Sequence, residues 1–228
     1  MNQSYQFKGF TREALEFLHD IKYYNSKSWY EEHKPDYRRL LLTPFQNLVG
    51  DLSGFMLSID AQFVTTPAVD KTISRIYRDT RFSRDKSLYR DSMWFTFKRP
   101  ALDWKEVPVY FFEITPEGYR YGMGFYSASK EYMDKFRERI KAKPERFLEA
   151  VSFLNRSNSF VIEGERYKKN RAGDLPDQLR DWFQYKSFCI TSNHQIDRVL
   201  FNGELVGELM AEFGMMAPLY DYLWRLIA

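Results

Sequence analysis

The chain has 228 residues, of which 44% are hydrophobic and 29% charged, and its formal net charge is +3. This is an ordinary composition for a globular protein of one domain or two small ones. No apolar run approaches the roughly 20 residues of a membrane span, no signal-peptide pattern opens the chain, and a lone cysteine excludes an intramolecular disulfide, so we expect a cytoplasmic protein without a membrane partner.

The first 60 residues have the pattern of helices. Apolar residues at helical spacing predict a first helix over 10–21. Ser26 or Ser28 is expected to cap a short second helix, and Pro35 is expected to end it. A Thr-Pro pair then begins the longest apolar stripe, which predicts a third helix over 43–59.

The middle of the chain favours strands. Thr, Ile, Tyr and Phe are frequent from residue 72 onward, which predicts a strand over 72–78 followed by an irregular loop. Residues 92–98 alternate between two faces, with Met93, Phe95 and Phe97 on one and Trp94, Thr96 and Lys98 on the other, which predicts another strand. A Thr-Pro-Glu-Gly turn separates two further strands, 109–114 and 119–125, as a β-hairpin.

Helices return toward the C-terminal end. The remaining expected elements are a helix capped by Ser127 or Ser129, a helix from Pro144, a hairpin of 160–162 with 166–168, a helix from Pro176, a strand over 187–191, and two final helices near 202–213 and 218–226. Helices therefore cluster at both ends, with most strands between residues 72 and 191. This order predicts an α+β fold in a single domain, 1–228, with a largely antiparallel central sheet.

The densest group of functional side chains lies in the middle of the chain. The stretch from Lys71 to Lys105 contains ten Lys or Arg residues and four Asp or Glu residues, which gives it a net charge of +6. The candidate ligand-binding residues are Arg75, Arg78, Asp79, Arg81, Asp85, Lys86 and Tyr89. Arginine forks grip carboxylate or phosphate through paired hydrogen bonds, so this cluster indicates a cleft for an anionic ligand, with the aspartates orienting the forks and the tyrosine donating a hydrogen bond or stacking.

A structural alternative stays open. Arginines and aspartates also form ion-pair networks that bind nothing. The excess of cations over carboxylates in this stretch leaves some charge for a ligand. Nearby arginines should also lower the pKa of Asp79 and Asp85, which argues against either as a general acid near neutral pH.

The spacing of the cluster, Arg75-x-x-Arg78-Asp79-x-Arg81-Phe82-x-x-Asp85-Lys86-x-x-Tyr89, resembles the signature of the family called domain of unknown function 2461. The resemblance covers essentially the whole chain. Its other matching stretches are Asn25-x-x-x-Trp29-Tyr30, Gly118 to Gly124, Lys168 to Gly173, Lys186-Ser187-Phe188 and Pro218-Leu219. Ser87-Leu88 departs from the family, which usually has Pro before the Tyr. The resemblance implies no particular reaction.

Other possible chemistry has weaker support. The three histidines lack metal-ligand spacing, and Cys189 lies in an apolar run that indicates a buried, inert thiol. Glu163 and Glu165 with Lys168 match the acid-and-lysine pattern of metal-dependent nucleases, but so short a pattern arises by chance. We predict no metal site and leave the cofactor unassigned. Lys168 and Arg171 lie in a second basic patch, which is either a solvated hairpin end or, if it folds over the central motif, part of the same anion cleft.

Three hypotheses follow. The first is a protein that binds a small anionic molecule, with any catalysis left open. The second is a nucleic-acid-binding protein that uses the same basic stretch, with Tyr77, Phe82, Trp94 and Trp104 for base stacking; we rank it lower because the part after Ala172 carries eight acidic and only four basic residues. The third is a structural or interaction module whose arginine cluster is an internal network.

Overall fold

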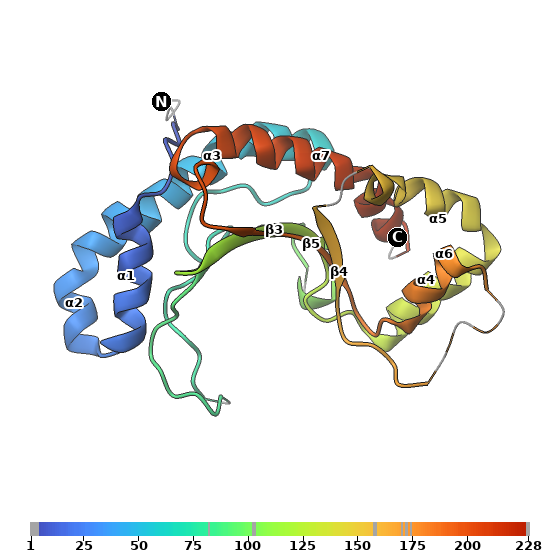
Figure 1. The fold of residues 1–228 in the computed structure, drawn as a ribbon, viewed down its shortest axis with the longest axis horizontal. Helices are drawn as coiled ribbons and strands as arrows, with labels where there is room; N and C mark the ends of the chain where they lie inside the picture. The colour runs from blue at the N-terminus through green and yellow to red at the C-terminus, as the bar shows by residue number, and fades with distance from the viewer. Residues whose placement is uncertain are drawn as a thin grey trace. The chain divides into compact units, whose positions relative to one another are not determined.

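The computed structural model describes residues 5–81, 83–101, 104–156, 159–169, 171, 173 and 175–226. The elements in chain order are α1 (Arg12–Tyr23), α2 (Lys27–Asp36), a π-helical segment (Tyr37–Leu42), α3 (Thr43–Ile59), β1 (Met93–Phe97), β2 (Val109–Ile114), β3 (Gly118–Gly124), α4 (Lys130–Ala142), α5 (Pro144–Ala150), β4 (Phe160–Glu163), α6 (Asp177–Arg180), β5 (Cys189–Gln195) and α7 (Glu204–Trp224) (Figure 1). No helix of these described residues is both long and apolar enough to cross a membrane.

The strands form one five-stranded sheet in the order β1-β2-β3-β5-β4. The pairing of β4 with β5 is antiparallel, and its register runs from Phe160 opposite Ser192 to Glu163 opposite Cys189. The predicted α+β fold with a largely antiparallel sheet is therefore confirmed.

Contacts along the chain gather in two compact units. The first unit comprises residues 1–97, 111–121 and 193–211, and the second comprises 98–110, 122–192 and 212–228. Strands β2, β3 and β5 each contribute residues to both units.

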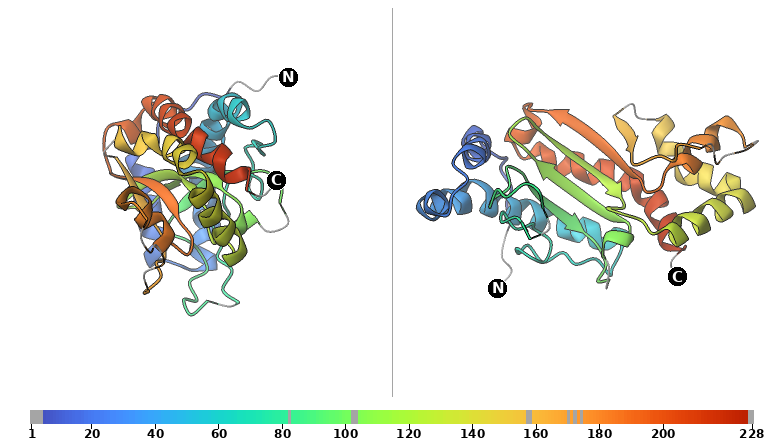
Figure 2. Two further views of the ribbon diagram at one scale, coloured as in Figure 1. Left: turned by 90° about the vertical axis from the view of Figure 1, so that its right-hand side faces the viewer. Right: turned by 90° about the horizontal axis from the view of Figure 1, so that it is seen from below.

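The first unit has an aromatic core. Phe10, Phe45, Phe95 and Phe112 are buried, and their ring centroids lie 5.2 to 6.2 Å apart in successive pairs. Helices α1 and α2 lie side by side, as both Figure 1 and Figure 2 show. The Thr11 hydroxyl accepts a hydrogen bond from the Ala14 amide at the start of α1, and Ser26, one of the two predicted caps, does the same for Trp29 in α2.

The predicted break between the second and third helices is wrong. Helix α2 continues through Pro35 into the π-helical segment and on into α3, so Pro35 does not end a helix. Thr43 has helical dihedral angles, and its amide donates to the Arg38 carbonyl five residues back. Leu40 and Leu41 are buried within the wider turn. We infer that the burial of these two leucines offsets the backbone hydrogen bonds that Pro35 and Pro44 cannot donate.

The second unit has its own aromatic core. Phe147 meets Phe136, Trp182 and Tyr222 with ring centroids 5.0 to 5.5 Å apart, and Phe188 packs on Trp182. Ser129, one of the two serines predicted as caps, precedes helix α4, and its hydroxyl accepts a hydrogen bond from the Tyr132 amide. Helix α5 begins at Pro144 as predicted.

The predicted hairpin of 160–162 with 166–168 is wrong, because β4 pairs with β5 instead. Gly164, with φ of +157°, turns the chain away after β4, and a side chain there would clash with the Ser187 carbonyl. Arg166 then forms an isolated bridge with Tyr185. The two predicted final helices are also one helix, α7, which contains Pro218 and keeps a buried stripe along its whole length.

Candidate functional site

The basic motif lies on a long loop of the first unit. The predicted strand over 72–78 is wrong as a continuous strand: only Ile73 and Tyr77 form isolated bridges, with Phe95 and Tyr89. The Arg78 amide donates a hydrogen bond to the Leu88 carbonyl at 2.8 Å. This bond and the bridge between Tyr77 and Tyr89 join the two arms of the loop that is drawn in green in Figure 1. We call residues 78–90 the basic loop. Of the residues predicted for base stacking, Phe82 lies outside the described residues, as does the side chain of Trp104.

The base of this loop is held by one side chain, Asn25. Its Nδ2 donates to the carbonyls of Ile21 and Tyr89, both at 2.9 Å. Its Oδ1 accepts from the amides of Leu88 and Tyr89 at 2.6 and 3.0 Å. Both donors and both acceptor positions of the amide group are therefore used. Asn25 joins the end of α1 to the loop and has no capacity left to bind a ligand.

A cluster of tyrosines also packs at the base of the basic loop. The Tyr30 ring stacks on Tyr89 with centroids 4.5 Å apart, and Tyr77 lies 5.2 Å from Tyr30 and 5.0 Å from Tyr89. Tyr89 is only 2% exposed. Its side chain therefore packs inside the first unit and does not present its hydroxyl or ring to a ligand as predicted. The exposed part of the site is the polar segment between Arg78 and Leu88.

These tyrosines make the protein sensitive to high pH. Burial, with the neighbouring Tyr77 hydroxyl, raises the pKa of Tyr89 and of Tyr37 from 10.0 to about 12. Above pH 10 the unfolded chain releases protons that the folded chain keeps, so these groups stabilise the fold below pH 10 and lose that effect as pH rises toward 12. We expect urea midpoints to fall across this window, measured by circular dichroism. A double Tyr37→Phe, Tyr89→Phe variant should show a flatter decline; an unchanged decline would contradict the assignment.

Each motif arginine has a carboxylate partner. Arg81 meets Asp79 through two hydrogen bonds of 3.0 and 2.7 Å. Arg78 lies 3.0 Å from Asp85, and Arg75 pairs with Asp70. The hydrogen bonds from Arg81 lower the pKa of Asp79 to about 2, so that carboxylate is ionised at neutral pH.

The pKa of Asp85 is also lowered, mainly by the hydrogen bond that its carboxylate accepts from the Ser87 amide. The expected direction for both aspartates is thus obtained, although a backbone amide is the first cause at Asp85. The Lys86 ammonium donates to the Thr80 carbonyl at 2.9 Å instead of to a carboxylate. The partner of Lys86 in this bond is therefore a neutral carbonyl, which leaves the positive charge of the ammonium uncompensated by it.

The pairs leave an excess of positive charge. The basic loop carries five cations, Arg78, Arg81, Arg84, Lys86 and Arg90, against two carboxylates, Asp79 and Asp85, which gives it a net charge of +3. Arg84 and Lys86 are exposed, and the Arg81 side chain is 77% exposed. Arg90 lies at the base, with its guanidinium 4.7 Å from the centre of the Trp94 ring. The exposed excess therefore lies between Arg81 and Lys86.

The other two predicted ligand residues belong to the second unit. The Arg171 guanidinium lies 3.9 Å from the centre of the Tyr167 ring, over which Arg137 and Lys186 also lie, at 5.4 and 5.7 Å. Lys168 is exposed. These contacts form a cation–π cluster within the second unit. They do not by themselves make Lys168 and Arg171 part of the basic loop.

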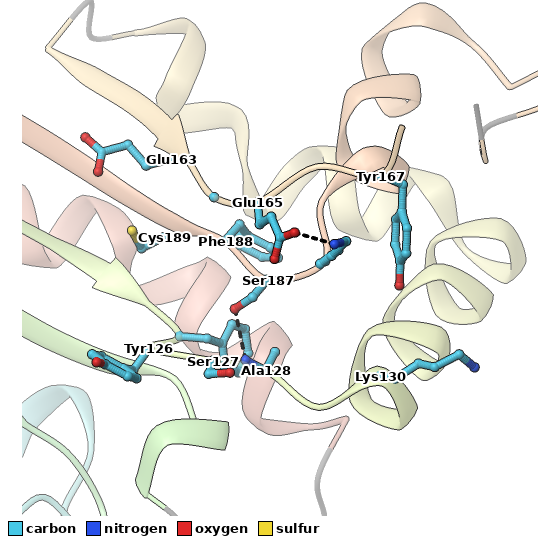
Figure 3. A pocket seen from close by; sticks show the side chains of 13 residues that line it. Tyr126, Ser127, Ala128, Lys130, Glu163, Glu165, Tyr167, Ser187, Phe188 and Cys189 are labelled. Carbon is cyan, nitrogen blue, oxygen red and sulfur yellow. Dashed lines mark hydrogen bonds and ion pairs between the residues drawn. The ribbon is translucent and has the colours of Figure 1, made fainter. Parts of the chain in front are cut away.

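Close to this cluster, the second unit contains a pocket of about 520 Å³. It is lined by Phe125, Tyr126, Ser127, Ala128, Lys130, Glu163, Gly164, Glu165, Tyr167, Lys186, Ser187, Phe188 and Cys189. Figure 3 shows Tyr167 and Lys130 at one end and Glu163 and Cys189 at the other. The expectation of a buried Cys189 is wrong, because its side chain is half-buried in this wall.

The polar groups of this pocket are mostly engaged. Glu165 pairs with Lys186, the Ser187 hydroxyl accepts from the Ala128 amide at 2.9 Å, and Glu163 accepts from the Thr191 hydroxyl at 2.7 Å. Among the residues with described positions, no three His, Cys, Asp or Glu side chains are grouped to hold a metal ion. Glu163, Glu165 and Cys189 stand out one by one in the sequence, but their meeting depends on the unpredicted pairing of β4 with β5.

Comparison with known proteins identifies a family. A family model described as a conserved hypothetical protein, DUF2461, matches residues 13–222, which include the basic loop, Asn25 and the second-unit pocket. The curated proteins gave no match.

Proposed function

The chain belongs to the DUF2461 family, and we propose that it binds an anionic ligand, one that carries phosphate or carboxylate groups, through the exposed cations of the basic loop. The observation that carries this proposal is the exposed excess of positive charge on a loop whose base is fixed. The groups expected to bind the ligand are Arg81, Arg84 and Lys86.

The ion pairs of the loop do not prevent binding. Exposed ion pairs contribute little to stability, and both Arg81 and Asp79 are more than half exposed. A phosphate group offers more charge and more acceptor oxygens than one carboxylate. It can therefore replace Asp79 at the Arg81 fork at little cost.

The same exposure argues against a purely structural network. A buried ion pair would destabilise the fold strongly if broken. Here the side chains of Arg75, Arg81 and Asp85 are more than half exposed, and that of Arg78 is 29% exposed. Such pairs add little to the stability of the fold, so the cluster needs another explanation, and ligand binding provides one.

The fixed base favours binding as well. Asn25 and the tyrosine cluster hold both ends of the exposed segment. A ligand then orders only the few residues between them, which lowers the entropic cost of binding.

Removal of three loop charges tests the proposal. In the triple variant Arg81→Gln, Arg84→Gln, Lys86→Gln, affinity for pyrophosphate measured by titration calorimetry is expected to fall about tenfold or more, because charge-assisted hydrogen bonds are lost. The melting temperature should change little, because exposed charges are removed. A matched control, Lys143→Gln, Arg146→Gln, Arg156→Gln, removes the same charges elsewhere and should bind normally. Equal losses of pyrophosphate affinity in both variants would indicate only a general effect of charge and would contradict the proposal.

A further inference from the structure

The first unit exposes aromatic rings next to the basic loop. Of the seven large hydrophobic side chains exposed among the described residues, four lie at the end of α1 or on the two arms of the loop: Tyr23, Tyr24, Tyr77 and Leu88, which are 72%, 59%, 45% and 43% exposed. Exposed aromatic surface gathered at one place commonly marks a binding site.

Two of these tyrosines line a shallow pocket of about 510 Å³. Its other walls are Asn25, Ser26, Ser28, Trp29 and Glu32. The Tyr24 and Trp29 rings are close to parallel, at 17°, with centroids 6.0 Å apart, and His33 stacks on Trp29 at 4.2 Å. We call this the aromatic pocket. A stack of this kind offers a flat ring a surface of the right shape.

Asn25 makes the aromatic pocket and the basic loop neighbours. It lines the pocket, and its amide group bonds the backbone of Leu88 and Tyr89. Lys86 is only two residues before Leu88, and two residues of chain span at most about 7 Å, so its backbone lies close to the residues that Asn25 binds. A ligand that spans the two features would combine an anionic part with a flat aromatic part.

We propose that the anionic ligand of the basic loop is a nucleotide, free or within a single-stranded nucleic acid, whose base stacks on Tyr24 while its phosphate meets the loop cations. This inference rests on the proposed function and names its ligand class. Stacking of bases on aromatic side chains next to a cationic groove is the usual chemistry of single-strand binding.

The polar groups of the aromatic pocket fit a base better than a phosphate. Glu32 and Ser28 line it and are exposed. A carboxylate accepts hydrogen bonds from the exocyclic amino groups of adenine, cytosine and guanine, and it repels phosphate. The Glu32 charge therefore orients the ligand, with the base in the pocket and the phosphate on the loop.

The test compares pyrophosphate, adenosine diphosphate and a short adenine oligonucleotide, each titrated against the intact protein by calorimetry. The nucleotide should bind about tenfold more tightly than pyrophosphate because of stacking. In Tyr24→Ala this advantage should vanish while pyrophosphate affinity stays unchanged. Tyr126→Ala, at a tyrosine of similar exposure outside the aromatic pocket, should keep it.

The outcomes separate the two proposals. Equal affinity for pyrophosphate and nucleotide, unchanged in Tyr24→Ala, overturns the base-stacking inference but leaves anion binding intact. A loss of self-association in Tyr24→Ala without any change in nucleotide affinity also overturns it, because the rings would then serve an interface between copies. No binding of any of the three probes refutes the proposed function itself.

Where nucleotide binds, the oligonucleotide identifies its source. Affinity of the oligonucleotide above that of the nucleotide, falling steeply with added salt, indicates single-stranded nucleic acid. Equal affinity for the two indicates a free nucleotide. Both results support the inference, since each requires a base beside a phosphate.

Discussion

Replacing Asn25 by alanine is expected to lower the free energy of unfolding by about 3 kcal/mol. The side chain makes four hydrogen bonds, three of them to the backbone of Leu88 and Tyr89. Each such bond contributes roughly 0.5–1.5 kcal/mol, and partly buried backbone groups would be left without partners. Because the loop base and the tyrosine cluster depend on these bonds, the loss should also weaken anion binding.

Urea denaturation followed by fluorescence measures this effect, and the melting temperature should fall by about 6–12 °C. The matched control is Asn47→Ala, within α3, where the substitution removes an asparagine from a helix interior and should cost little. Hydrogen exchange at the Leu88 and Tyr89 amides should accelerate in Asn25→Ala. If stability fell by less than 1 kcal/mol and exchange at both amides stayed slow, Asn25 would not be the clamp of the loop.

Replacing Arg137 by methionine should be similarly costly in the second unit, by about 3–4 kcal/mol. Arg137 is 7% exposed, and its guanidinium donates to the carbonyls of Tyr185 and Phe183 at 2.6 and 3.3 Å. It also pairs with Asp134 at 2.8 Å. Methionine fills much of the volume but leaves both carbonyls and a carboxylate without these donors.

The measurement is again equilibrium unfolding in urea, with the exposed Arg146→Met of α5 as the control. The control should stay within about 0.5 kcal/mol of the wild type, as surface substitutions usually do. A similar small change for Arg137→Met would show that water replaces its hydrogen bonds. Pyrophosphate affinity should be unchanged in Arg137→Met molecules that remain folded, because the proposed ligand groups are in the first unit.

Short-range chemistry explains the features that the sequence predicts well. The hydroxyls of Thr11 and Ser129 cap helices because they reach an amide three residues away. The hairpin of β2 and β3 is set by its Thr-Pro-Glu-Gly turn. The alternation in β1 places Met93, Phe95 and Phe97 together on one buried face, although Thr96 on the other face is buried as well. Each of these signals involves neighbours in the chain.

The errors have a common physical origin in long-range burial. Proline favours helix ends locally, but the buried side chains of Leu40 and Leu41 keep the helix going through the π-helical segment. Likewise, β4 has a sequence neighbour that could pair with it, but it pairs with β5 about 30 residues later. Propensity alone does not contain these contacts.

The candidate site divides in the same way. Charge density on the basic loop and the lowered pKa of Asp79 are visible in the spacing of arginines and aspartates. The role of Asn25 is not, because its partners Leu88 and Tyr89 lie 63 and 64 residues away. The local signals are an asparagine close behind a helix, a position where such residues commonly bond backbone groups, and the match of Asn25-x-x-x-Trp29-Tyr30 to the family. The burial of Tyr89 follows from the same distant contact.

The most direct test of anion binding at the basic loop is a nuclear magnetic resonance titration of nitrogen-labelled protein with pyrophosphate. We expect saturable shifts at the amides of residues 83–88 and at the side chains of Arg81 and Arg84, with the amides of α4 and α5 unmoved. Shifts confined to the second unit, or no saturable shift at any amide, would contradict the account.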